Sequence, residues 1–283
     1  QYIIGTRVIV GTTSMIASKP FIFNLKHFKL AIIDESSQIL EPNLVGLLTA
    51  VDKFILIGDY KQLPAVVQQS EKDSAIPTID DRQDHAVIDM SILQDICLSN
   101  CRNSLFERLI RWEGHEKRSD FIGILRRQGR MHPEIAEFPN QMFYRREQLE
   151  PVPCPHQLET ELAYTLPSQD ALDDVLKAHR MIFIPSQFCK EPNVSDKINA
   201  SEASIVVDVL RRVHRFYGKD FNAQKTVGVI VPYRNQIAMI RKGIEKLGIP
   251  ELEHISIDTV ERYQGSQRDV IIYSFTIQNI WQL

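Results

Sequence analysis

The sequence lacks the features that mark several large classes of protein. It has only four cysteines, Cys97, Cys101, Cys154 and Cys189, and none form the Cys-x-x-Cys spacing of a zinc or thioredoxin-like site. Cys97 and Cys101 are one helical turn apart, but no second pair of ligands completes a zinc site, so we expect free thiols. We see no apolar run of membrane-spanning length and no signal peptide, which predicts a cytoplasmic protein, with a nucleoid or nuclear location left open.

An excess of positive charge is also missing. The chain carries 33 Lys and Arg against 36 Asp and Glu, a net charge of −3, so any nucleic-acid surface must be local. Its 283 residues are 43% hydrophobic, enough to bury the core of one large domain or two ordinary ones.

The sequence holds no glycine-rich phosphate loop, although an acidic pair that binds Mg²⁺ beneath phosphates would require one. In "LAIIDESSQIL" (30–40), an apolar strand ends in Asp34 and Glu35, where open α/β sheets bind ligands and an acid commonly holds Mg²⁺ beneath phosphates. The only Gly-Lys pair is Gly218-Lys219, and Asp220 follows it instead of Ser or Thr. Either the acids have nothing to do with phosphate, or the chain is part of a longer protein.

Strand-like and helix-like segments alternate along the chain, which predicts α/β domains with doubly wound, mainly parallel sheets. Helices are expected after the capping residues Ser104 and Asn199, and a third should end at Gly248. We expect two domains, 1–118 and 119–283, and loops with short helices over 70–103. The expected strands are 7–10, 30–33, 54–57, 181–184, 226–231 and 270–273.

A second polar cluster follows the apolar strand of "FILIGDYKQLPAVV" (54–67), which opens at Gly58 into Asp59 and Gln62. If this strand lies parallel to the first, Gln62 should come beside Asp34 and Glu35, where its amide could contact a terminal phosphate. A solvated turn is the alternative.

Two further stretches lie in the second half. In "LRRQGRMHPEIAEFPNQMFY" (125–144), Arg130 precedes a Pro-started helix whose Ile135 and Phe138 should face a core; an arginine there could neutralise phosphoryl-transfer charge or simply be solvated. In "ISIDTVERYQGSQRDVIIYS" (255–274), a polar turn with Thr259 and Gly265 joins two strands, and an ordinary crossover loop is the alternative.

In this order the stretches resemble the superfamily 1 helicases of the Upf1-like/DNA2-like group. "DESSQ" is similar to that family's Asp-Glu-Ala-Ser/Ala-Gln, "GDYKQLP" to Gly-Asp-x-x-Gln-Leu-Pro, and "LRRQGRMHP" to Leu-x-x-Gln-Tyr-Arg-Met-His-Pro. "VIVPYRNQ" is similar to its Thr-Pro-Tyr segment, and "TVERYQGSQRDVII" to Thr-Val-Asp-x-Phe-Gln-Gly-x-Glu-x-Asp-x-Ile. The resemblance implies two RecA-like domains of the P-loop NTPase type, both incomplete, with ATP and Mg²⁺ as cofactors.

The resemblance also implies roles for individual residues. Asp34 would ligate Mg²⁺, Glu35 would orient or deprotonate the attacking water, Gln62 would sense the γ-phosphate and Arg130 would stabilise its charge. Further nucleotide contacts are implied for Gly58, Asp59, Gln128, Gly265 and Gln267. Single-stranded nucleic acid, with DNA favoured over RNA, would touch Thr13, Pro232, Tyr233 and Thr259.

Three positions depart from the family pattern. Gly129 replaces a tyrosine that would stack on adenine, Gln267 replaces a glutamate near the nucleotide, and Ala65 stands where a second proline is common. The family's phosphate loop would precede Gln1 and its Val-Ala-x-Thr-Arg-Ala motif would follow Leu283, so the remaining parts of the same protein are expected partners.

The leading hypothesis is therefore a fragment of an ATP-dependent helicase that translocates 5′ to 3′, inactive by itself. A non-catalytic nucleic-acid-binding scaffold derived from a helicase is the alternative. Gly129 and Gln267 favour the scaffold, whereas the retained acids, Gln62 and Arg130 favour the enzyme. A Gly-x-x-Gly-x-Gly-Lys-Thr upstream in the full reading frame would decide for the enzyme.

Overall fold

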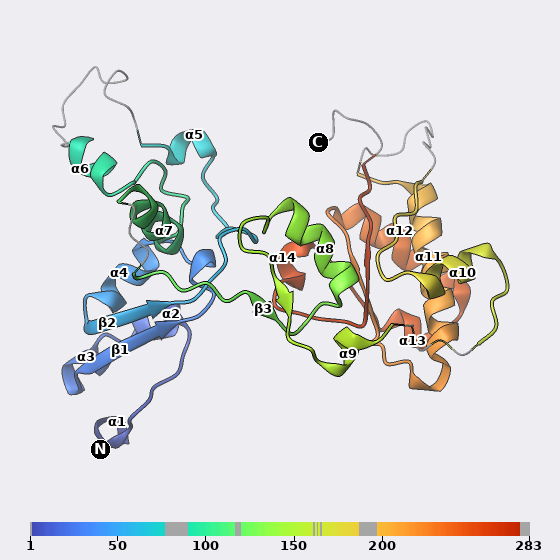
Figure 1. Cartoon of the computed structure of the whole chain (residues 1–283), viewed down its shortest axis with the longest axis horizontal. Helices are drawn as coiled ribbons and strands as arrows, with labels where there is room; N and C mark the ends of the chain where they lie inside the picture. Colours follow the sequence, from blue (N-terminus) through green and yellow to red (C-terminus); the bar gives the residue numbers. More distant parts are fainter. Residues whose placement is uncertain are drawn as a thin grey trace. The chain divides into compact units, whose positions relative to one another are not determined.

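The computed structural model describes residues 2–76, 90–116, 120–160, 162, 164, 166–186 and 197–277. The chain divides into two compact units, Gln1–Leu125 and Arg126–Leu283, and both combine helices with parallel strands (Figure 1). No helix in the described ranges is long and apolar enough to cross a membrane.

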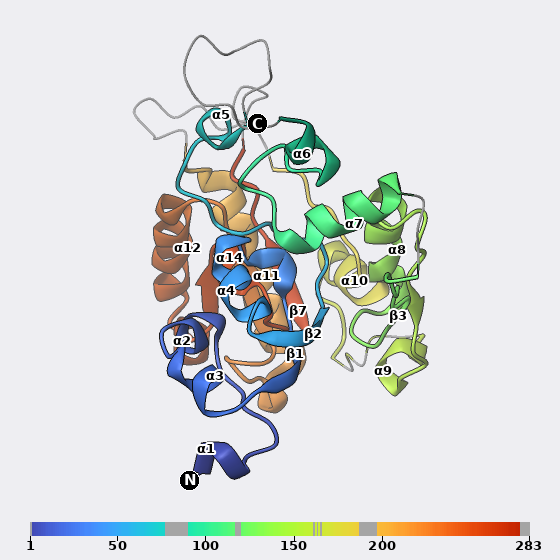
Figure 2. The same ribbon diagram turned by 90° about the vertical axis from the view of Figure 1, so that its left-hand side faces the viewer.

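The first unit is built on two parallel strands, β1 (Phe28–Ile33) and β2 (Val51–Leu56), which lie side by side in Figure 2. The helix between them, α4 (Pro42–Leu48), packs against β2, and a small core forms around Ile33, Leu44 and Leu105. Leu105 opens α7 (Leu105–His115), where the Ser104 hydroxyl accepts a hydrogen bond from the Glu107 N–H, so the predicted start of this helix is confirmed.

Short helices make up the rest of the first unit. They are α1 (Tyr2–Gly5), α2 (Thr13–Ala17), α3 (Phe21–Leu25), the 3₁₀ turn η1 (Ser36–Gln38), α5 (Glu71–Ser74) and α6 (Met90–Asp95). The last two agree with short helices predicted over 70–103, of which 77–89 lie outside the described residues. The strand predicted at 7–10 was wrong. Val8 and Val10 are 72% and 87% exposed, and no described strand pairs with them, so their β-branched side chains alone do not make a strand.

The second unit has a three-stranded parallel sheet with β5 (Val227–Ile230) between β6 (Ser256–Asp258) and β7 (Val270–Tyr273). Val227 and Val229 on β5 are fully buried and pack with two long helices, α11 (Ala200–Tyr217) and α12 (Arg234–Leu247). The parallel, helix-covered sheet confirms the predicted fold class.

The ends of both long helices follow local sequence signals. The side chain of Asn199 accepts a hydrogen bond from the Glu202 N–H at the start of α11. Gly218 (φ 52°) ends α11 and Gly248 (φ 63°) ends α12, and both have a positive φ that glycine adopts without steric cost. The predicted boundaries at Asn199 and Gly248 are confirmed.

The remaining elements surround this sheet or precede it. They are the parallel pair β3 (Arg127–Gln128) and β4 (Glu150–Pro151), α8 (Pro133–Met142), α9 (Pro155–Leu158), α10 (Ala171–Ala178), η3 (Gly218–Asp220), α13 (Pro250–Glu253) and α14 (Val260–Tyr263). The strand predicted at 181–184 was wrong: Met181 and Phe183 are 48% and 75% exposed, with no described strand beside them.

The Pro-started helix α8 forms as predicted, but it does not turn Phe138 toward a core. Phe138 is 56% exposed, and Ala136 is the buried residue. The side chain of Asn140, one turn after Ala136, exchanges two hydrogen bonds with the backbone of Leu149. Because residues four apart share a helix face, these contacts place the 136/140 face inward and Phe138 outward.

A partly buried ionic cluster joins the start of α10 to α11. The Arg212 guanidinium binds both carboxylate oxygens of Asp170 (2.7 and 2.8 Å) and one of the fully buried Asp173 (2.6 Å). The hydrogen bonds from Arg212 lower the pKa of Asp170 from 3.8 to about 2. Burial acts to raise the pKa of Asp173, but hydrogen bonds from the Gln169 N–H, Arg212 and Arg215 outweigh it and hold that pKa below its ordinary value.

Candidate functional site

The acidic pair lies in a strained turn directly after β1. Glu35 has the left-handed backbone conformation (φ 52°, ψ 33°), which costs an L-residue roughly 1–2 kcal/mol. The turn is held by the Glu35 N–H, which donates to Oδ1 of Asp34 (3.0 Å), and by the Gln38 amide, which donates to Oε2 of Glu35 (2.8 Å). Both acids remain exposed. Such strain persists where surrounding contacts enforce it, and it is concentrated at functional sites.

Two serines fasten this turn to the end of the neighbouring strand. The N–H and the hydroxyl of Ser36 both donate to the Ile57 carbonyl (2.8 Å each), and the Asp59 N–H donates to the Ser37 hydroxyl (3.2 Å). A Cβ on Gly58 would lie 2.9 Å from the backbone nitrogen of Ser37, so only glycine permits this approach. The structure thus brings Asp34 and Glu35 to the same sheet edge as Gly58 and Asp59.

Ser36 and Ser37 are buried, and the sequence analysis gave them no role. The available signal was a pair of small polar residues directly after the acids, together with a glycine after the next strand.

Gln62 belongs to the loop after β2. Its amide donates to Oδ2 of Asp59 (3.0 Å), and its N–H donates to the Asp59 carbonyl (3.2 Å). In the described part of the chain no hydrogen bond joins Gln62 to Asp34 or Glu35. Gln62 therefore shares their sheet edge through Asp59 rather than by direct contact.

The chemistry of Asp34 fits a magnesium ion. Mg²⁺ typically takes one or two carboxylates, keeps several waters and binds substrate phosphates, so it needs no cage of protein ligands. Asp34 offers an exposed carboxylate, of which Oδ1 alone accepts a hydrogen bond from the part of the chain that the structure describes. Among the described residues no group of three or more His, Cys, Asp or Glu side chains could hold a metal.

In the second unit, Arg130 lies in a tight turn between β3 and α8. Oε1 of Gln128 accepts hydrogen bonds from the N–H groups of Arg130 (3.0 Å) and Met131 (2.7 Å), and its Nε2 donates to the Met131 carbonyl (2.7 Å). Gln128 is thus half-buried and occupied in shaping the turn. The guanidinium of Arg130 is exposed and has no hydrogen-bond or ion-pair partner among the residues that the structure describes.

Gly129 leaves open space at the position where the helicase pattern in the sequence analysis has a tyrosine. A Cβ added there would meet only Sγ of Cys154, at 3.8 Å, an ordinary van der Waals distance. The carbonyl of Gly129 accepts a hydrogen bond from Nε2 of His156 (3.1 Å). The turn therefore has room for a larger residue.

Two of the residues predicted to bind nucleic acid lie at one edge of the three-stranded sheet of the second unit. Ile230 of β5 is opposite Asp258 of β6 in the parallel register, so Tyr233 and Thr259 each follow the carboxyl end of one of two neighbouring strands. Pro232 precedes Tyr233 in the same connection. Nζ of Lys197 lies 6.0 Å from the centroid of the Tyr233 ring, which places a cation beside this aromatic face.

Thr259 begins α14 without capping it through its side chain, and its hydroxyl lowers the pKa of the neighbouring Glu261 carboxyl. Thr13 lies in the other unit, where it is half-buried and is the first residue of α2. It does not follow a strand, since residues 7–10 do not form one.

Gly265 and Gln267 occupy the loop between α14 and β7. Gly265 has a φ of 77°, and Gln267 is exposed, with its carbonyl accepting a hydrogen bond from Arg268 (2.7 Å). The loop is anchored by Tyr263, which packs so closely on β5 that a Cβ at Gly228 would lie 1.7 Å from its hydroxyl oxygen. Sequence analysis missed this contact between Tyr263 and Gly228.

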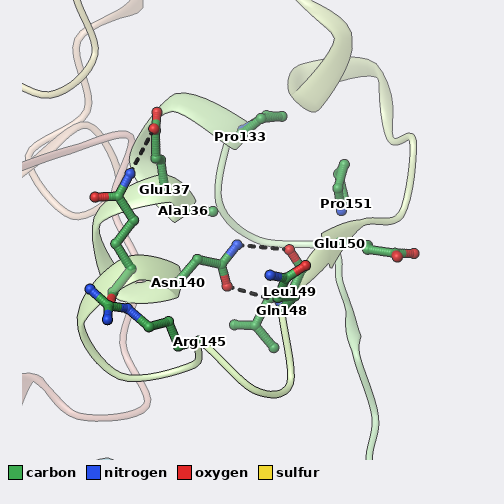
Figure 3. Close-up of a pocket in the computed structure, with 10 residues that line it drawn as sticks. Pro133, Ala136, Glu137, Asn140, Arg145, Gln148, Leu149, Glu150 and Pro151 are labelled. Carbon is green, nitrogen blue, oxygen red and sulfur yellow. Dashed lines mark hydrogen bonds between the residues drawn. The ribbon is translucent and has the colours of Figure 1, made fainter.

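A cavity of about 370 Å³ lies between α8 and the segment around β4 (Figure 3). Asn140 spans it, and its two hydrogen bonds to Leu149 occupy the backbone at this edge of β4. None of the residues predicted for a site lines it. Its lining residues are Pro133, Ala136, Glu137, Asn140, Gln141, Arg145, Gln148, Leu149, Glu150 and Pro151.

Comparison with known proteins assigns both parts of the chain to related families. Two family models, both described as AAA domain, match residues 101–280 and 1–70. DNA polymerase alpha-associated DNA helicase A of Saccharomyces cerevisiae is 30% identical over 98% of this chain and 38% of its own length. An uncharacterized ATP-dependent helicase of Methanocaldococcus jannaschii is 28% identical, over 95% of this chain and 34% of its own length.

DNA replication ATP-dependent helicase/nuclease DNA2 of Xenopus laevis is 28% identical over 98% of this chain and 24% of its own length. The chain therefore spans between about a quarter and two fifths of these three relatives.

Proposed function

Because this chain belongs to the AAA domain family, with DNA2-like and Upf1-like helicases among its relatives, we propose that the intact protein is an ATP-dependent helicase that moves along single-stranded nucleic acid. The observation that carries the proposal is the strained Asp34–Glu35 turn, held by Ser36 and Ser37 at the carboxyl edge of a parallel sheet. The left-handed glutamate strains the backbone, and each of the two exposed carboxylates keeps one oxygen for which the structure shows no hydrogen bond from a described residue.

In this proposal the first unit supplies the metal and the water. Asp34 ligates Mg²⁺, which neutralises charge on the phosphates, and Glu35 orients or deprotonates the attacking water. Gln62 contacts the γ-phosphate. Its present bond to Asp59 holds it on the loop that follows β2, so it can respond to a nucleotide at that sheet edge.

The second unit supplies positive charge and the nucleic-acid surface. Arg130 stabilises the charge that develops on the γ-phosphate, a role that its exposed guanidinium permits. Tyr233 offers a face on which a base can stack, and Thr259 offers a hydroxyl to the backbone. We propose DNA as the substrate ahead of RNA, since two of the relatives above carry DNA in their names, although a regulator of nonsense transcripts from Dictyostelium discoideum is also 29% identical.

A scaffold that binds nucleic acid without turnover is the second candidate. The observation in its favour is Gly129, which presents no side chain to a base, together with the exposed amide of Gln267 in place of a carboxylate.

The substitution Glu35→Gln in the intact protein distinguishes the two. It keeps the shape of the side chain and leaves Asp34 in place, so ATP binding should persist while hydrolysis falls on the order of 10²- to 10⁴-fold. Glu71→Gln, an exposed acid on α5, is the matched control and should leave the rate unchanged. An intact protein that binds ATP but shows no nucleic-acid-stimulated hydrolysis even before substitution would favour the scaffold. A nucleotide affinity that falls as steeply as the rate would assign Glu35 to binding.

A further inference from the structure

Two side chains of the short helix α9 hold the turn that carries Arg130. We propose that Gln157 and His156 are positioning residues for Arg130, and that they set the orientation in which its guanidinium meets the phosphate. This inference rests on the function proposed above for Arg130. Neither residue belongs to a stretch that the sequence analysis singled out.

Gln157 joins both ends of the turn. Its Nε2 donates to the carbonyls of Gln128 and Met131, each at 2.9 Å, and its Oε1 accepts from the Cys154 N–H (3.3 Å). The side chain is only 3% exposed, so these bonds are shielded from water and costly to lose. The Gln157 amide thus fixes the spacing between residue 128, where β3 ends, and residue 131, just before α8.

His156 acts on the middle of the same turn. Its Nε2 lies 3.1 Å from the carbonyl oxygen of Gly129 and donates a hydrogen bond to it. Glycine has more backbone freedom than any other residue, so a turn with Gly129 next to Arg130 loses more entropy when it is fixed. A bond to the Gly129 carbonyl restrains the peptide unit that links Gly129 to Arg130.

The Arg130 side chain itself adds no restraint. Within the described ranges its guanidinium has no partner, so its direction depends on the backbone of the turn. That backbone is held by the side chains of Gln128, His156 and Gln157. A shift of this turn would therefore displace the Arg130 guanidinium although Arg130 itself is unchanged.

The test is Gln157→Leu in the intact protein. Leucine fills the same buried space but removes both donors, so kcat for ATP hydrolysis should fall on the order of 10²-fold, as a small misplacement of a charge-stabilising group does. KM for ATP should stay near the wild-type value, because Arg130 acts on charge that develops in the transition state. Gln141→Leu is the matched control and should change neither constant, because the Gln141 amide donates to Glu137 at the surface of α8.

A double-mutant cycle separates positioning from mere folding. If Gln157 acts through Arg130, then Arg130→Ala combined with Gln157→Leu should be no slower than Arg130→Ala alone. Losses that multiply, or a wild-type kcat for Gln157→Leu, would overturn the inference. If Gln157→Leu does not fold, as judged by its melting curve, His156→Phe on the exposed side of α9 is used in the same cycle. Full hydrolysis by Arg130→Ala would instead refute the proposed role of Arg130, so the two failures are distinguishable.

Discussion

The backbone N–H of Asp59 donates a hydrogen bond to the hydroxyl of Ser37 at 3.2 Å, which joins the loop after β2 to the turn after β1. This bond requires the two backbones to approach closely, and Gly58 is the residue that allows it. The same contact supports the left-handed Glu35, two residues before Ser37. The close approach therefore connects a packing requirement at Gly58 to the geometry of the acidic turn.

Gly58→Ala should separate the two segments. The added methyl would lie 2.9 Å from the Ser37 nitrogen, which is backbone and cannot swing away. We expect a loss of about 1–3 kcal/mol in the free energy of unfolding, measured by urea denaturation, together with a lower rate of ATP hydrolysis by the intact protein. Gly46→Ala in α4 is the control: nothing lies within 4 Å of the new Cβ, and helix propensity predicts a gain of about 0.5–1 kcal/mol. Equal stability of the two variants would contradict the close approach.

The ionic cluster around Arg212 predicts how the second unit responds to acid. The pKa of Asp170 is lowered to about 2 and that of Asp173 is also below its ordinary value, so both carboxylates stabilise the folded state above pH 4. That contribution should be lost progressively as the pH falls from about 4 toward 2, because the unfolded chain then binds protons more readily than the folded one. Thermal melting at several pH values measures this slope.

Removing the cation should flatten that slope. Arg212→Leu removes one of the two arginines that bind the buried Asp173 and leaves it Arg215 and the Gln169 N–H, so we expect a loss of roughly 1.5–3 kcal/mol at neutral pH and a weaker dependence on acid. Arg211→Leu is the control, since Arg211 is 40% exposed and its one ion pair within the described ranges is with Asp208. It should change stability by less than about 1 kcal/mol. An unchanged acid slope in Arg212→Leu would show that other groups govern acid unfolding.

Local signals in the sequence predicted much of the fold. The caps at Ser104 and Asn199 and the stop at Gly248 fixed three helices, because these boundaries depend on hydrogen bonds within a few residues. A strand forms only where a neighbouring strand can pair with it. The strands predicted at 7–10 and 181–184 were wrong because no described strand pairs with these apolar runs. The prediction of which face of α8 is buried was also wrong. That face is set by the hydrogen bond from Asn140 to the Leu149 carbonyl, which the spacing of apolar residues does not reveal.

The candidate site likewise contains residues that local sequence predicts and residues whose roles depend on distant contacts. The placement of Asp34 and Glu35 after a strand follows from the apolar run that precedes them. The roles of Ser36 and Gln157 do not, because Ser36 binds a carbonyl 21 residues away and Gln157 one 29 residues away. Contacts between such distant positions become visible only when the chain is folded.

Gly129 should weaken the selection of adenine. Without a side chain there is no aromatic face at this turn, and stacking on a base is worth about 1–3 kcal/mol. In the intact protein, Gly129→Tyr should raise the preference for ATP over GTP by roughly tenfold or more. The turn should tolerate the change, since the new Cβ would meet only Cys154 Sγ at 3.8 Å. Gly123→Tyr, where nothing lies within 4 Å of the Cβ, is the control. An unchanged preference for ATP over GTP would mean that other residues bind the adenine base.

Tyr233 and Thr259 should contribute to binding of single-stranded DNA, which is expected to be weak and steeply dependent on salt. The chain has a net charge of −3, so attraction must come from local cations at this edge such as Lys197, Arg234 and Arg262. Tyr233→Ala with Thr259→Ala should lower the affinity of a labelled oligonucleotide about tenfold at low salt, measured by fluorescence anisotropy.

The competing interpretation is that both residues serve only to start the helices α12 and α14. Neither side chain makes a capping hydrogen bond, so on the binding interpretation the double variant should melt close to the wild-type temperature. Thr160→Ala is the control. It removes a hydroxyl at an exposed position of the same unit that is distant in sequence from Tyr233 and Thr259, so it should leave the affinity unchanged. Unchanged affinity, or a loss that follows the fraction unfolded, would return Tyr233 and Thr259 to a structural role, because a group that contacts the nucleic acid must weaken binding while the protein stays folded.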